Sequence, residues 1–376
     1  MGPFSLRFAV LFCAGLCWWA RAQQSAGADP VQRRVKDGDA AFGHGDYEIA
    51  RRSFENAWQV AQRLPADAPV RYEILKRLTA TTAASGQFAE AKRYLQQAVE
   101  WRESTVGPND PKILEDLLLS INLDLRTKDF DRALATAERV RAMHIAAYTA
   151  DSLPVADDFL RVGQIYLAER KVQEAARALS TADGLRTKFA GSLDPGLLPI
   201  LDGLNEAFRA IAGGGGTGAE AIYRQALTIR ETLYGEDSTQ LISTLEGLAD
   251  TYAAGGEYIA AEPVYERLLS LWESLVGKDH PMVAITLDKL VVFYAKEGKP
   301  DKAREALARS VAIRARFLAV GLSHEASDKI AQGRRDQAMT LYNRALAALG
   351  PPGPSNEDLI AQIRKSLIDI QKPTAK

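Results

Sequence analysis

The chain of 376 residues has little cysteine, little histidine and no excess of either charge. Its two cysteines, Cys13 and Cys17, lie near the amino terminus, so the remainder can form neither a disulfide nor a thiolate metal site. The formal net charge of −1 gives no electrostatic reason to expect a nucleic-acid partner. Alternating β-branched residues, which are typical of strands, are also scarce. These absences disfavour disulfide-rich folds, β folds and nucleic-acid-binding proteins.

Residue patterns of catalytic and cofactor sites are equally sparse. The four histidines are scattered along the chain, and His324-Glu325 is not followed by a second histidine one helical turn later, as a zinc protease motif requires. The glycine run Gly213 to Gly216 lacks the lysine and the preceding strand of a phosphate-binding loop, so we interpret it as a flexible turn. The sequence therefore predicts no catalytic residue, no cofactor and no metal site.

The sequence is rich, by contrast, in one recurring feature, an alanine that returns at a nearly constant spacing. The eight anchor alanines, as we call them, are Ala50, Ala91, Ala133, Ala175, Ala219, Ala261, Ala303 and Ala338. Their period of about 42 residues is typical of a helical repeat, in which each unit stacks on its neighbours.

The residues around each anchor alanine predict how one unit folds. Glycine stands five positions earlier in six of the eight units, which suits a turn that ends one helix. The small anchor lets a second helix approach the first, and a large residue usually follows four positions later to fill the space between them. Each unit is therefore predicted to be helix A, a turn and helix B.

This pattern resembles the tetratricopeptide repeat, in particular the longer repeat of kinesin light chains. The likeness is strongest in Gly256 to Glu262 and in the loop Gly277 to Ala284. The family motif also has a small residue twelve positions before the anchor, where this chain has Gly38, Thr79, Gly163, Ala207, Ala249 and Ala326, but departs with Ile121 and Val291. The resemblance implies an all-α, right-handed superhelical solenoid of about eight helical hairpins over residues 31–349.

The carboxyl end is predicted to close this solenoid. The eighth unit is shortened, and its helix A is expected around Ser323 to Ala331. Residues 350–354 are rich in proline and glycine and break the chain. Residues 355–376 are expected to form a capping helix and tail, because Leu359, Ile363 and Ile370 fall on one apolar stripe. A docking helix for another chain is the alternative interpretation of this stripe.

The amino terminus predicts export. Arg7 precedes an apolar run to Ala20, and Ala20-Arg21-Ala22 has the small-x-small pattern of a signal peptidase site. We therefore expect residues 1–22 to be a signal peptide, followed by a short linker of residues 23–30, and a periplasmic or extracellular location in a bacterium. An uncleaved membrane anchor is the alternative, although the run is short for a bilayer span.

With no catalytic set, the concave groove lined by the A helices becomes the candidate site. If the register follows the family, groove positions lie eleven and fifteen residues before each anchor. The candidate groove residues, including the asparagine that matches the kinesin light chain pattern, are Lys76, Asn122, Gln164, Asn205, Glu246, Asp250 and Asp288. The acidic trio among them, Glu246, Asp250 and Asp288, favours a basic or amide-rich peptide, unless these charges only form a solvated face.

The sequence thus predicts an exported, non-catalytic scaffold that binds protein or peptide segments of envelope or secreted partners. It predicts no nucleic-acid partner and no membrane span once the leader is removed. Two alternatives stay open at this stage: a self-associating structural protein, and the accessory arm of a cell-envelope enzyme complex.

Overall fold

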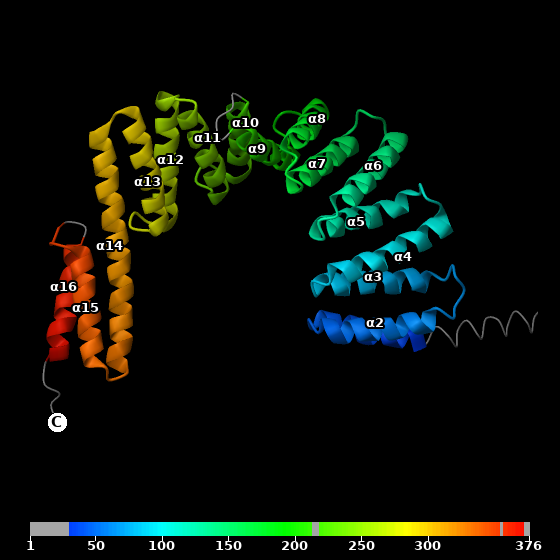
Figure 1. Cartoon of the computed structure of the whole chain (residues 1–376), viewed down its shortest axis with the longest axis horizontal. Coiled ribbons are helices and arrows are strands. Elements are labelled where there is room, and N and C mark those ends of the chain that lie inside the picture. Colours follow the sequence, from blue (N-terminus) through cyan, green and yellow to red (C-terminus); the bar gives the residue numbers. More distant parts are fainter. Residues whose placement is uncertain (1–29, 213–217, 354–355, 372–376) are drawn as a thin grey trace, which may run out of the picture. The chain divides into compact units, whose positions relative to one another are not determined.

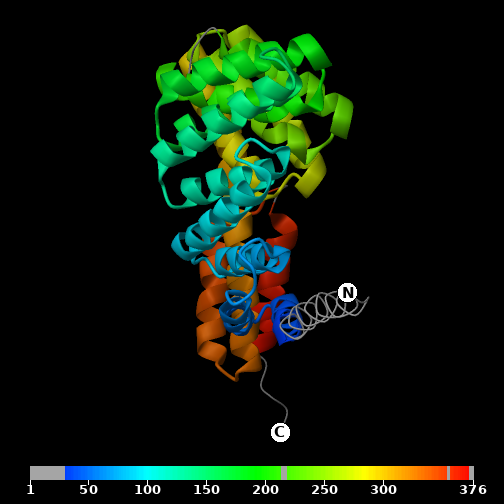
Figure 2. The same ribbon diagram turned by 90° about the vertical axis from the view of Figure 1, so that its right-hand side faces the viewer.

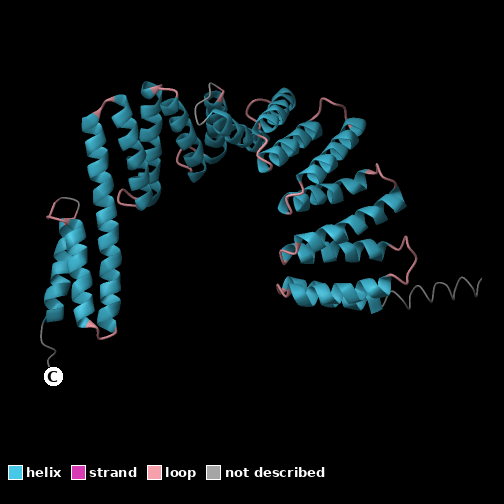
Figure 3. Ribbon diagram, in the orientation of Figure 1, coloured by secondary structure: helices cyan, strands magenta, loops and turns pink. Residues whose placement is uncertain are grey.

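A computed structural model of the chain describes residues 30–212, 218–353 and 356–371. The predicted leader, most of the linker 23–30, the run Gly213 to Gly216 and the end of the predicted tail lie outside the described residues. The chain divides into two compact units, unit 1 up to Gly191 and unit 2 from Ser192. All regular structure in the described ranges is helical (Figure 3).

Unit 1 is a stack of helices in which each helix packs on the next one along the chain (Figure 1). Residues 30–43 are helical and form the first helix A. The following helices are α2 (Tyr47–Ala61), α3 (Pro69–Ala84), α4 (Phe88–Val106), α5 (Leu114–Arg126), α6 (Phe130–Ala147), α7 (Leu153–Ala168) and α8 (Val172–Ala190). The odd-numbered helices are A helices and the even-numbered ones are B helices.

Unit 2 continues the same alternation up to its last three helices. Its elements are α9 (Leu198–Ala212), α10 (Ala219–Tyr234), α11 (Ile242–Ala254), α12 (Tyr258–Val276), α13 (Pro281–Glu297), α14 (Pro300–Ala331), α15 (Arg335–Leu349) and α16 (Glu357–Gln371). Single 3-10 turns, at Pro111–Ile113, Pro195–Leu197 and Thr239–Leu241, lead into three of the A helices.

The anchor alanines are close contact points of each helix pair, and the predicted all-α hairpin repeat is confirmed. Seven of the eight anchors are at most 2% exposed, and Ala303 is 9% exposed. Each lies in the first turn of a B helix. A small side chain is needed at this point because the two helix backbones come together there.

Where the residue five positions before the anchor is described, the turn keeps its shape even if the glycine is missing. Gly45, Gly256 and the other described glycines of the series have φ between 76° and 82°. Lys128 and Arg170 stand at this position in the third and fourth units and adopt φ of 59° and 65°. The packing of helix A on helix B therefore imposes a left-handed backbone that costs these two side chains about 1 kcal/mol each.

A size rule links two positions of each unit. A Cβ added to Gly38, twelve residues before an anchor, would lie 2.5 Å from the ring of Phe54, four residues after it. The same addition at Gly163 would lie 2.5 Å from Leu179 Cγ. Because the two side chains share one space, a small residue at the first position accompanies a large one at the second.

The two units that depart from the motif can be compared with this size rule. In the third unit the sizes are exchanged, and both Ile121 and Ala137 are buried. In the seventh unit Val291 stands at the first position, and Leu307 at the second is 48% exposed, whereas its counterparts in the other units are at most 5% exposed. Beyond Leu307 the chain departs from the regular repeat, because α14 continues past the residue at which other B helices end.

The separate helix A predicted around Ser323 to Ala331 is wrong, because α14 runs unbroken for 32 residues from Pro300 to Ala331. In four other units the B helix ends fifteen residues after its anchor, before a glycine such as Gly277 with φ of 89°. The corresponding residue here is Ala319, which has no preference for that backbone and continues the helix. One helix thus serves as helix B of the seventh unit and helix A of the eighth.

The last three helices bury a core of their own. Leu359, Ile360 and Ile363 of α16 are buried and form a cluster with α15 and the second half of α14. Both views show α15 and α16 alongside that half of α14 (Figures 1 and 2). Arg316, near the middle of α14, holds this bundle by a bidentate pair with Asp358 at 3.0 Å. Packing of a last helix on the final repeat is what a terminal cap of a solenoid provides.

Buried aspartates link successive repeats of unit 1. Asp116 of α5 is 1% exposed; it accepts a hydrogen bond of 2.9 Å from the Tyr72 hydroxyl and lies 3.2 Å from Arg102 Nε. Asp158, one repeat later on α7, is also 1% exposed and lies 2.7 Å from His144 Nδ1. Burial raises the pKa of both carboxyls against the lowering effect of their partners. Each pair joins the end of a B helix to the next A helix.

Candidate functional site

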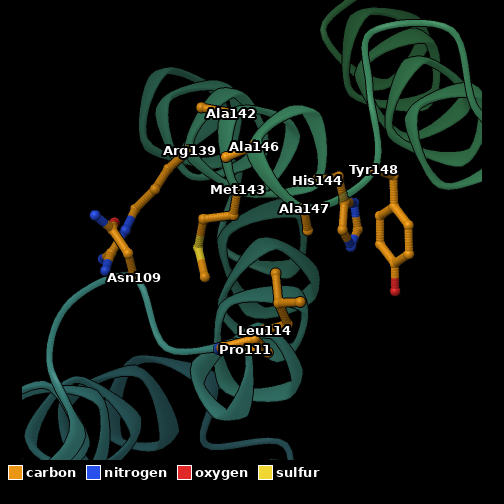
Figure 4. A pocket seen from close by; sticks show the side chains of 10 residues that line it. All are labelled: Asn109, Pro111, Leu114, Arg139, Ala142, Met143, His144, Ala146, Ala147 and Tyr148. Atoms are coloured by element: carbon orange, nitrogen blue, oxygen red, sulfur yellow. The ribbon is translucent and has the colours of Figure 1, made fainter.

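Three of the candidate groove residues lie on consecutive A helices of unit 1. Asn122 of α5 and Gln164 of α7 are exposed, as groove positions should be. Lys76 of α3 is half-buried and donates to Glu115 Oε1 at 2.7 Å, and this bond is the main reason that the pKa of Glu115 is lowered. The hollows at the ends of α4 and α6 in unit 1 are lined by other residues, as Figure 4 shows for the one at the end of α6.

In unit 2, a hollow between α11 and α13 contains part of the acidic trio. It measures about 510 Å³, and Asp250 and Asp288 lie at its wall. Its apolar surface comes from Ala253, Ile285 and Val292, of which Ile285 is 46% exposed and Val292 is 56% exposed. Glu246 stands one helical turn before Asp250 on α11. This hollow therefore offers apolar contact area bordered by carboxylates.

The carboxylates of the acidic trio already have cationic partners. Lys289 of α13 pairs with Glu246 and lies 3.1 Å from Asp250 Oδ2, so one ammonium serves two carboxylates. Asp288 pairs with Arg314 of α14. Burial lowers the pKa of Lys289, but the two carboxylates outweigh it and the pKa is raised overall. The hollow is thus close to neutral, not strongly negative.

Tyr265 is a further partner of Asp250 at this hollow. Its ring is buried and packs against Phe293 at 5.2 Å between centroids, and its hydroxyl donates to Asp250 Oδ1 at 2.6 Å. Burial first, and the bond to Asp250 second, raise the pKa of this tyrosine. Asp250 is therefore held by a tyrosine and a lysine in one orientation at the edge of the hollow.

A second hollow of about 390 Å³ lies between α9 and α11 and contains Asn205. Contrary to the exposed groove position expected for it, Asn205 is only 5% exposed, and its Oδ1 has no hydrogen-bond partner among the described residues. Asp202, Glu206 and Arg209 of α9 line the same hollow. A buried amide oxygen without a partner is costly, so this oxygen is a place where a ligand N–H would be stabilising.

The prediction from the sequence missed three residues of the unit 2 face, namely Ile285, Lys289 and Val292. Val292 lies eleven residues before its anchor, which is one of the two groove positions that the register defines. Lys289 gives no such signal, because its partners lie about one repeat earlier on another helix.

Two further properties of the described residues bear on the site. No group of three or more His, Asp or Glu residues within the described ranges is arranged to hold a metal ion. Over the same part of the chain, none of the helices combines the length and the apolar character that a bilayer span requires.

Family models place the same repeat on this chain. Models described as tetratricopeptide repeat match residues 75–112, 214–271 and 240–316. The first match spans most of α3 and all of α4, and the other two span α10 to α13 and the first half of α14. The repeat recognised from the anchor alanines is thereby confirmed. Among curated proteins, none matches the sequence of this chain.

Solved structures similar to the chain are helical repeat proteins at low identity. TPR-like repeats from Podosopora anserina, described as kinesin light chain, share 20% identity, with a TM-score of 0.47, over 55% of this chain and 97% of theirs. A tetratricopeptide repeat protein from Parabacteroides merdae shares 14%, with a TM-score of 0.43, over 90% and 99%. A Rap protein complexed with Competence and Sporulation Factor shares 12%, with a TM-score of 0.38, over 91% and 98%.

Proposed function

We propose that this chain, of which residues 75–112, 214–271 and 240–316 match tetratricopeptide repeat models, is an exported, non-catalytic scaffold that binds an extended peptide on the A helices of unit 2. The observation that carries the proposal is the pair of hollows between α9, α11 and α13. Repeat folds of this kind provide extended surfaces, and their A helices form the surface on which a partner segment can lie.

The chemistry of the two hollows favours a particular kind of segment. Ile285 and Val292 offer an exposed apolar surface for one aliphatic side chain of the peptide. The buried oxygen of Asn205 accepts a hydrogen bond from a peptide N–H. Because Lys289 and Arg314 already neutralise the acidic trio, a strongly basic peptide would first have to displace them. We therefore favour the amide-rich segment over the basic one.

Replacing Val292 by aspartate should weaken partner binding on this face. The substitution puts a charge into the apolar part of the hollow, and we expect affinity to fall at least about tenfold. Full-length protein is immobilised, its partner is captured from an envelope fraction and identified, and its dissociation constant is then measured for each variant. Folding should be preserved, since Val292 is more than half exposed.

Ile259 of α12 provides the matched control. It is 91% exposed and does not line either hollow, so Ile259→Asp should leave partner binding unchanged. The triple alanine variant of Glu246, Asp250 and Asp288 tests the charge preference, because a basic peptide would lose affinity and an amide-rich one would lose little. Equal binding by Val292→Asp and the parent protein would refute the proposed site.

The proposed location has an independent test. We expect signal peptidase to cut after Ala22 and to leave Gln23 as the first residue, because Ala20-Arg21-Ala22 has the required small-x-small pattern. Amino-terminal sequencing of protein recovered from the cell envelope and from the medium measures the cut directly. A protein that still begins at Met1 would favour the uncleaved anchor.

A further inference from the structure

The long helix α14 has one side that stays exposed along most of its length. Figure 1 shows α13 beside the first half of α14, and α15 and α16 beside its second half on the opposite side. Between these two flanks, residues at helical spacings of three, four and seven fall on one side of α14. We call this side the α14 seam, and its members are Arg304, Leu307, Val311, Arg314, Leu318, Gly321 and Glu325.

The middle of the α14 seam is apolar and open to solvent. Leu307 is 48% exposed, Val311 is 55% exposed and Leu318 is 53% exposed. The other broad side of α14 is polar, with Arg309 bound to Glu273 and Arg316 bound to Asp358. Three large aliphatic side chains in one line are thus left uncovered on one side of the helix only.

The two ends of the α14 seam carry opposite charges. Arg304, at the first end, pairs with Asp301 three residues earlier, and both side chains are more than three-quarters exposed. Such a surface pair contributes little, so this guanidinium is available to a second carboxylate. Glu325, at the other end, is exposed, and its carboxylate has no ion pair or hydrogen bond within the described ranges.

Gly321 is a second, independent sign that another helix approaches the α14 seam. It lies in the interior of an exposed helix, where glycine is less favourable than alanine. Nothing lies within 4 Å of a Cβ built at this position, so packing within the chain does not require the missing side chain. Close approach of a second helix would require it.

The α14 seam matches itself when its direction is reversed. If a second α14 lies antiparallel on it, with the two-fold axis between Arg314 and Ala315, three complementary pairs form, and each occurs twice by symmetry. The pairs are Val311 with Leu318, Leu307 with Leu322, and Arg304 with Glu325. Gly321, next to the half-buried Leu322, leaves room for the Leu307 side chain of the second copy.

We propose that the α14 seam is a dimer interface on which α14 of a second copy of this chain lies antiparallel. The charges select this occupant, because each copy offers a guanidinium where the other offers a carboxylate. A parallel pair would instead bring like charges together. The α14 seam includes none of the residues that line the two hollows of the proposed peptide site, so the dimer does not depend on that proposal.

Sedimentation equilibrium of the full-length protein over a series of concentrations tests the interface. We expect the mass to rise from that of one chain to that of two. Val311→Arg should raise the dissociation constant at least about tenfold, because it puts a charge opposite Leu318 at two symmetric places. Ile368→Arg of α16 is the matched control; this residue is 59% exposed and lies on another helix, so dimerisation should be unchanged.

A charge exchange tests the antiparallel register. Arg304→Glu alone, or Glu325→Arg alone, places like charges opposite each other and should weaken the dimer at least about threefold. The double variant restores both pairs with their charges exchanged and should recover the affinity of the parent protein. Association through exposed apolar side chains without this register would not show such a recovery.

Three results would overturn the proposal. They are the mass of one chain at every concentration, a dimer that Val311→Arg does not weaken, and a double charge variant no tighter than the single ones. If the protein stays monomeric but binds a different protein, and Val311→Arg abolishes that binding, the α14 seam belongs to that partner and not to a second copy.

Discussion

Replacing Arg102 by methionine is expected to lower the free energy of unfolding by about 3–5 kcal/mol. The guanidinium is the cation beside the buried carboxylate of Asp116, and it also lies over the Tyr72 ring at 3.9 Å. Methionine keeps most of the apolar stem but removes the ion pair, so that among the described residues the tyrosine hydroxyl is the remaining hydrogen-bond donor to Asp116. Chemical denaturation of the parent and the variant at neutral pH measures the difference.

The effect should depend on pH in a defined direction. Because burial raises the folded-state pKa of Asp116, the folded protein binds this proton more tightly than the unfolded chain does, and stability falls as pH rises through the folded-state pKa. Loss of Arg102 raises that pKa further, so the deficit should be small in acid and largest at neutral pH. The double variant Arg102→Met with Asp116→Asn should recover most of the loss. A deficit that does not vary with pH would contradict this account.

Exchanging the sizes of Ile121 and Ala137 is expected to show strong coupling between the two positions. Ile121→Ala alone should cost about 2–5 kcal/mol through a cavity, and Ala137→Leu alone about 1–3 kcal/mol through overpacking. The double variant recreates the arrangement of the fourth unit, where Gly163 faces Leu179, and should be more stable than the sum of the single effects predicts. Thermal and denaturant unfolding of the four proteins gives the coupling energy.

The outcome distinguishes a local size rule from general sensitivity of the core. A coupling of at least about 1 kcal/mol in favour of the double variant would support the rule. Independent, additive losses would mean that Ile121 and Ala137 do not share one space. Substitution of Gly184 by alanine serves as a control for helix content, because nothing lies within 4 Å of a Cβ at that position.

Much of the candidate site could be placed on helices from the register alone. The spacing from the anchors placed Asp250 and Asp288 at groove positions of A helices, and in the structure both lie at the wall of one hollow. The same spacing also indicates Val292. It could not reveal that Lys289 joins Glu246 to Asp250, because a lysine side chain can reach several neighbours and the choice depends on how α11 and α13 stack. Because Lys289 neutralises Glu246 and Asp250, the groove is less acidic than the sequence predicts.

Other features carry a signal in the sequence that the predictions did not use. Arg102 and His144 lie one full repeat apart, and so do their partners Asp116 and Asp158. In both repeats a basic residue lies fourteen positions before an aspartate. The recurrence of this spacing indicates a link between a B helix and the next A helix. Ala319 in place of the glycine that ends other B helices likewise indicates the unbroken α14.

The sequence by itself determines the series of helical hairpins. Helix period, a turn residue and a small contact residue are properties of neighbouring positions, and they recur with the anchors. The packing of the helices in three dimensions settled which charges neutralise one another, which asparagine is buried, and where the hollows lie. Those outcomes depend on side chains from helices of successive repeats, and their distances are set by how the repeats stack, not by the spacing within any one of them.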